Sequence, residues 1–181
     1  ATTVIGWSVL AYESFGTKDI IIPALNKVQA ARARELCEQI SVGLSTKKDV
    51  ENITIDDIYI GDLIYDTYLK QYQVPTIELD SESFAKSLLS SIRNFVFWQD
   101  YFNNNHVRAV NVSHCVYHTA IPLRIAVSRD TPAYQANATH LYYLSKENLF
   151  AYTEFKYYPE VFKTLPEEDK KEGIAVAKRQ I

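Results

Sequence analysis

A short apolar run that leads into polar, titratable residues is the feature that most constrains this fold. Residues Val107–Val112 are few enough, and rich enough in β-branched side chains, for a buried strand. Ser113 and His114 follow directly, and a helical pattern then extends from about Tyr117 to Arg129. This order predicts a strand whose carboxyl end meets the start of a helix. Ligands bind there in an open α/β sheet, because helix N-termini offer unpaired N–H groups.

Ser113, His114 and His118 are therefore the first candidates for chemistry. Histidine is a frequent proton carrier because its pKa lies near neutral pH. In the alternative interpretation, Ser113 caps the helix and His114 hydrogen-bonds within a turn, which are common roles for these residue types. This segment by itself supports both interpretations.

The composition is that of a folded globular protein. Of the 181 residues, 47% are hydrophobic and 23% charged. A chain of this length suits one domain and is too short for two ordinary ones. The formal charge of −3 argues against nucleic acid as a partner, because phosphate binding needs clustered Lys and Arg. The apolar runs are far too short for a membrane span. Cys37 and Cys115 lack the paired spacing of a zinc site or redox motif, which favours reduced thiols in the cytoplasm.

Hydrophobic periodicity predicts helices that alternate with strands. The expected helices are Gly6–Gly16, Leu25–Leu44, a segment after Gly61, and Glu82–Asn104, which Ser81 would cap. The expected strands are Asp19–Ile22, one or two short pieces within Ile53–Ile60, Val107–Val112, Pro132–Ala136 and Thr139–Leu144. Such alternation is typical of an α/β fold, with a mostly parallel sheet and helices on both faces.

The segment from Gly61 to Lys70 is a second candidate for chemistry. Asp62 and Asp66, four residues apart, would share one face of a helix, where two carboxylates can hold a metal or act as a general base. As the alternative, Asp62 is a plain N-cap. Tyr65 and Tyr68 would stack on a sugar or, as the commoner role, fill the core.

A third candidate is the aromatic block 148–160, which contains Glu154, Lys156 and Tyr157. Aromatic faces mixed with hydrogen-bonding groups suit carbohydrate, whose C–H faces stack while its hydroxyls need donors and acceptors. The alternative is an aromatic seam against another part of the protein.

Three segments of the chain resemble bacterial proteins of surface-polysaccharide biosynthesis, which make capsule or O-antigen. They are GDLIYDTYL (61–69), VNVSHCVYHTAIPLRIAVSRDTPAY (110–134) and YTEFKYYPEVF (152–162), together about a quarter of the chain. GDLIYDTYL is the most specific of them. These proteins are generally taken to be glycosyltransferases of the GT-B type, which consist of two Rossmann-like halves.

The resemblance implies that residues 1–181 form one Rossmann-like domain, the N-terminal, acceptor-binding half of such an enzyme. The half that binds the nucleotide-sugar donor would lie beyond Ile181, in agreement with a final helical pattern that has no stop signal. The partners would be a nucleotide-sugar and a glycan acceptor. The place of work would be the cytoplasm or the inner face of the cytoplasmic membrane.

The resemblance supplies no catalytic residues, so roles are assigned from chemistry. A GT-B reaction needs a base for the acceptor hydroxyl and stabilisation of the leaving diphosphate. His114 is the first candidate for the base and Asp62 the second. Acceptor or phosphate contacts are expected from Ser113, His118, Arg124, Tyr65, Glu154, Lys156 and Tyr157. No cofactor and no protein-bound metal are expected, and the absence of an Asp-x-Asp triplet agrees with a metal-independent route.

Two other functions are weighed against the transferase. One is a non-catalytic sugar- or nucleotide-binding α/β domain that acts in an assembly. The other is a small hydrolase that uses Ser113 with a histidine. The hydrolase is disfavoured because no Gly-x-Ser-x-Gly turn surrounds Ser113.

Overall fold

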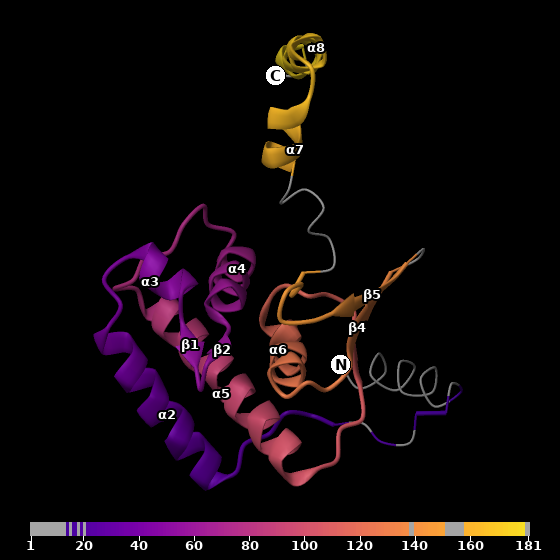
Figure 1. The fold of residues 1–181 in the computed structure, drawn as a ribbon. Coiled ribbons are helices and arrows are strands. Elements are labelled where there is room, and N and C mark those ends of the chain that lie inside the picture. Colours follow the sequence, from indigo (N-terminus) through magenta and orange to yellow (C-terminus); the bar gives the residue numbers. More distant parts are fainter. Residues whose placement is uncertain are drawn as a thin grey trace. The chain divides into compact units, whose positions relative to one another are not determined.

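The computed structural model describes residues 14, 16–17, 19, 21–137, 140–150 and 158–179. The chain divides into two compact units, which meet in the sequence between Val107 and Arg108 (Figure 1). The two units are defined by their internal contacts and not by independent folding, so the expectation of one domain over residues 1–181 remains a prediction.

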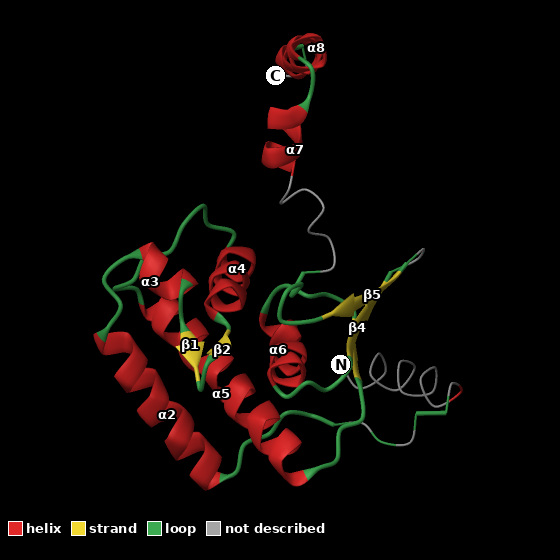
Figure 2. Ribbon diagram, viewed as in Figure 1, coloured by secondary structure: helices red, strands yellow, loops and turns green. Residues whose placement is uncertain are grey.

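The first unit is mostly helical, as Figure 2 shows. Its longest helix is α5 (Glu82–Asn104), whose N-terminus is capped by Ser81 through a 3.1 Å hydrogen bond from the Phe84 amide. This confirms both the predicted bounds and the predicted cap. Helices α2 (Lys27–Val42) and α4 (Gly61–Tyr72) pack against α5, which carries a buried apolar stripe. The stripe includes Phe84, Leu88, Ile92, Phe95 and Val96.

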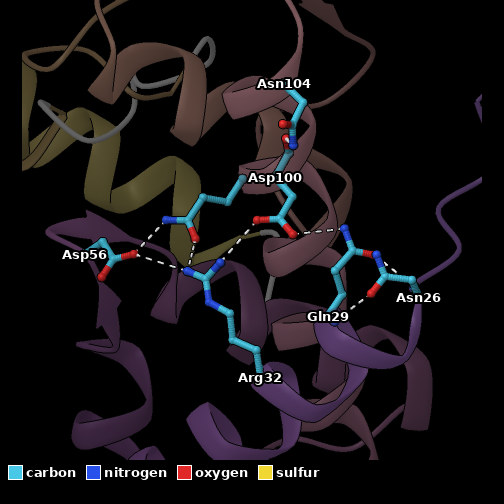
Figure 3. Close-up of polar contacts among 7 residues, drawn as sticks. Asn26, Gln29, Arg32, Asp56, Asp100 and Asn104 are labelled. Carbon is cyan, nitrogen blue, oxygen red and sulfur yellow. Dashed lines mark hydrogen bonds and ion pairs between the residues drawn. The ribbon is translucent and has the colours of Figure 1, made fainter.

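Helix α2 is attached to α5 largely through polar side chains (Figure 3). Only Ala33 of α2 is buried. Gln29 Nε2 donates to an Asp100 carboxylate oxygen at 2.9 Å, and Arg32 Nη1 donates to the other oxygen at 3.2 Å. Arg32 also donates to the side-chain oxygen of Gln99. Helix α2 therefore has a fixed register on α5 although it buries little apolar surface.

A two-stranded hairpin completes this network. Strands β1 (Thr54–Ile55) and β2 (Ile58–Tyr59) are antiparallel, and both turn residues have positive φ, 50° at Asp56 and 61° at Asp57. Two-residue hairpins require this left-handed conformation, which Asp tolerates better than most residues. Gln99 Nε2 donates to Asp56 at 2.6 Å, so the turn is joined to α5 (Figure 3).

The second unit contains a three-stranded sheet in the order β3-β4-β5. Strand β3 (Val110–Val112) is parallel to β4 (Ala133–Ala136), which is antiparallel to β5 (Leu141–Leu144). The short 3₁₀ helix η1 (His118–Ala120) leads into α6 (Ile121–Ser128), which packs on β3 and β4. Helices α7 (Tyr158–Thr164) and α8 (Glu167–Lys178) follow.

The predicted Rossmann-like sheet is wrong. The described residues form five short strands in two small sheets, and only β3 and β4 pair in parallel. The residues Ile53–Ile60 fold back on themselves as a tight hairpin and leave no strand for a larger sheet. This fold is not one half of a GT-B architecture.

The predicted strand Asp19–Ile22 is also wrong where it is described. Ile21 and Ile22 are 41% and 76% exposed, and neither belongs to a strand. The predicted helix Gly6–Gly16 lies almost wholly outside the described residues. Gly16, the predicted end of this helix, has a φ of +84°, the left-handed conformation that glycine adopts readily. No helix in the described part of the chain is long and apolar enough to cross a membrane.

Candidate functional site

A pocket of about 590 Å³ lies in the first unit, between α3 (Lys47–Glu51) and α4. It is lined by residues from the two helices, the turn after α3, and β2. The side chains combine positive, negative, aromatic and neutral polar groups. They are Thr46, Lys47, Lys48, Glu51, Asn52, Tyr59, Asp62, Tyr65 and Asp66.

Gly61 sets the distance between the two walls of this pocket. A Cβ atom at this position would lie 2.3 Å from the Val50 carbonyl oxygen and 2.4 Å from that of Glu51. The amides of Ile60 and Gly61 both donate to the Ile53 carbonyl, at 3.1 and 2.9 Å. The start of α4 is thus pressed against the end of α3, and only glycine permits this approach.

Helix α4 divides its faces between the core and the pocket. Leu63, Ile64 and Tyr68 are buried on the core side, and Asp62 and Asp66 lie one turn apart on the pocket side. Asp62 is in the first turn, where the helix dipole favours a negative charge, but the N-cap position belongs to Ile60. The alternative interpretation of Asp62 as the N-cap is therefore wrong.

Asp66 is the half-buried carboxylate of this pocket. Burial raises the pKa of Asp66, and the negative charges of Asp62 and Glu51 raise it further. Its carboxylate makes no hydrogen bond or ion pair with another described residue. A half-buried carboxylate of this kind accepts a proton more readily than an exposed one.

Lys47 provides positive charge on the opposite wall. Its ammonium lies 4.7 Å from the centre of the Tyr65 ring and 3.5 Å from a carboxylate oxygen of Glu51. A hydrogen bond with Tyr65 and the negative charge of Glu51 raise the pKa of Lys47. Lys47 is therefore a cation at the edge of the pocket, with a half-exposed side chain.

The pocket offers more hydrogen-bond acceptors than donors. Ionised carboxylates only accept, so the three of this pocket suit a ligand that carries several donors. Tyr59 adds an apolar ring surface, and Asp66 can accept a proton. Among the described residues, no group of three or more His, Cys, Asp or Glu side chains is placed to bind a metal ion.

The structure brings together two of the predicted site residues, Asp62 and Tyr65, in this pocket. Ser113, His114 and His118 belong to the second unit, where all three side chains are exposed. They follow the carboxyl end of β3, as predicted, but Ser113 does not cap a helix, since the N-cap of η1 is Tyr117. Its backbone carbonyl instead accepts a 3.1 Å hydrogen bond from the buried Gln135.

Arg124 does not have the position expected of a phosphate contact. It is 2% exposed, and its guanidinium lies 5.0 Å from the centre of the Phe150 ring. A guanidinium buried against an aromatic face has a packing role. Glu154, Lys156 and Tyr157 lie outside the described residues.

Sequence reasoning missed one wall of the pocket. The sequence analysis predicts no helix in residues 45–52, but they contain α3 and provide Lys47, Lys48 and Glu51. The available signal was the pair Thr46 and Asp49, which form a capping box. Asp49 accepts from the Thr46 amide at 2.6 Å.

No protein family, curated protein or solved structure matches this chain.

Proposed function

We propose that this chain takes part in sugar transfer during bacterial surface-polysaccharide synthesis, and that the pocket between α3 and α4 holds the sugar acceptor. One observation carries the proposal: Asp62, Tyr65 and Asp66 line a single pocket. All three belong to GDLIYDTYL, the most specific of the segments that resemble polysaccharide-biosynthesis proteins. The proposal does not depend on a GT-B fold.

The chemistry of the pocket supports a sugar as the ligand. Sugar hydroxyls donate hydrogen bonds, and the carboxylates of Glu51, Asp62 and Asp66 accept them. Tyr59 offers an apolar surface to the C–H face of a pyranose ring. The cavity volume of about 590 Å³ is in the range of small-molecule pockets.

Asp66 is the base in this account. It removes the proton from the acceptor hydroxyl while that oxygen bonds to the anomeric carbon of a nucleotide-sugar, and the nucleoside diphosphate leaves. Burial and the neighbouring carboxylates favour proton uptake by Asp66. The reaction takes place in the cytoplasm. No observation tests the base role expected for His114, and the step with Asp66 does not use it.

Titration calorimetry of the 181-residue chain with methyl glycosides of glucose, galactose and mannose tests the acceptor pocket. We expect binding with a Kd on the order of 1 mM, about −4 kcal/mol, for at least one of them. Asp66→Asn should weaken this binding about tenfold, because hydrogen bonds to charged groups contribute about 1.5–3 kcal/mol.

Asp80→Asn is the matched control, since it removes the same charge from an exposed residue that does not line the pocket. It should leave the affinity unchanged. Equal affinity for the Asp66→Asn and Asp80→Asn variants, or the absence of binding of any sugar, would contradict the proposal.

A further inference from the structure

An ammonium group already lies at the edge of the pocket, and the protein itself supplies it. The Lys47 ammonium lies over the Tyr65 ring, 4.7 Å from its centre, and 3.5 Å from Glu51. The ring attracts a positive charge through its quadrupole, and the carboxylate attracts it through its own charge. The space between Tyr65 and Glu51 therefore suits an ammonium in both position and charge.

A ligand that contacts the Tyr65 ring at the position of the Lys47 ammonium must displace that ammonium. Tyr65 is 6% exposed, and Lys47 lies over its face. The Lys47 side chain itself is 52% exposed, so its ammonium can turn out into water at little cost. If a neutral group replaced it, Glu51 would lose its cation, whereas an ammonium on the ligand would preserve the pairing.

Asp66 also favours a ligand whose ammonium takes the position of the Lys47 ammonium. Its carboxylate makes no hydrogen bond or ion pair with another described residue, and two further carboxylates line the pocket. An ammonium offers three N–H donors and a positive charge, and so it satisfies such a group better than a hydroxyl does.

We propose that the sugar bound between α3 and α4 carries a free amino group, whose ammonium takes the place of the Lys47 ammonium over Tyr65 and beside the pocket carboxylates. This inference rests on the proposed function and names the class of sugar. An N-acetylated sugar has lost the charge, and a uronic acid would add a fourth carboxylate to the three that are present. Both bind more weakly than the amino sugar.

Glucosamine and N-acetylglucosamine form the matched pair that tests this proposal. Titration calorimetry with the 181-residue chain is performed at a pH of about 6, where an amine of this kind is protonated. We expect glucosamine to bind about tenfold more tightly, from one cation–π contact and one or two partly screened ion pairs. Equal binding of the two sugars, or tighter binding of N-acetylglucosamine, overturns this inference and leaves the sugar pocket standing. If neither these two sugars nor the methyl glycosides bind, the proposed function fails as well.

Two lysine variants test the exchange itself. Lys47→Met keeps most of the side-chain volume and removes the ammonium from the Tyr65 ring, so glucosamine should bind about fivefold more tightly than to the wild type. Lys48→Met is the matched control, because it removes the same charge from the same pocket. Its effect should be about twofold or less. Equal gains in the two variants would show a general effect of charge and would overturn the exchange with Lys47.

Discussion

Burial and the neighbouring negative charges both raise the pKa of Asp66. The spacing of Asp62 and Asp66 in the sequence predicted that the two carboxylates share a helix face, and they do. It could not reveal that Glu51 lies opposite them, because Glu51 reaches the pocket through the packing of α3 on α4. The raised pKa of Asp66 is a consequence of that packing.

The first prediction concerns the stability of the Asp66→Asn variant. Because the pKa of Asp66 is raised in the folded state, its stabilising contribution is complete only below its pKa in the unfolded chain. That contribution is lost as the pH rises through the folded-state pKa. Asn resembles the protonated acid, so the variant should be more stable than the wild type at pH 7. We expect a gain of less than about 1 kcal/mol, the range of partly exposed charge interactions.

Urea unfolding of both proteins at neutral pH and at a pH of about 3.5 measures this difference. The gain should shrink in acid, where Asp66 of the wild type is itself protonated. Asp80→Asn, at an exposed residue outside the pocket, is the control and should change the stability at neutral pH by less than about 0.5 kcal/mol. A variant less stable than the wild type at neutral pH would mean that the carboxylate has a stabilising partner.

Individual helices were predictable from sequence because their signals are local. The bounds of α5 follow from Ser81 and an apolar stripe, and α2 lies within its expected range 25–44. Strand partners are set by contacts between residues distant in the sequence. The alternation of predicted helices and strands therefore led to the wrong sheet. The hairpin shows this clearly, because its pairing depends on positive φ angles at Asp56 and Asp57.

Gly61 carries the second prediction, at the scale of the α3–α4 pair. Gly61→Ala should lower the free energy of unfolding by about 2 kcal/mol or more, since the new methyl group overlaps backbone atoms that cannot turn aside. Gly43→Ala is the control, because a Cβ there meets only the Ile40 carbonyl oxygen, at an ordinary 3.6 Å, and φ is −89°.

Urea unfolding curves of the two variants measure how much stability each added methyl group costs. The Gly43→Ala variant should stay within about 0.5 kcal/mol of the wild type. Similar, small losses in both variants would mean that α3 and α4 are further apart than the structure has them.

For the molecule as a whole, the sequence located part of the candidate site but misjudged the fold. GDLIYDTYL was recognisable as a site segment because Asp62 and Asp66, four residues apart, share one helix face. The residues 45–52 carry no such pattern, and they become a pocket wall only when Gly61 lets α4 approach α3. The run Val107–Val112 contributes only the three residues of β3 to a strand.

The measurement that tests the central claim most directly is a map of backbone amide chemical shifts as glucosamine is added to the 181-residue chain. The account predicts that the shifts concentrate in residues 46–52 and 59–66, around the α3–α4 pocket, and that they weaken in the Asp66→Asn variant. Shifts concentrated in residues 113–118, with the pocket amides unchanged, would contradict it. Such a result would place the sugar-binding site at Ser113, His114 and His118, the first candidates from the sequence.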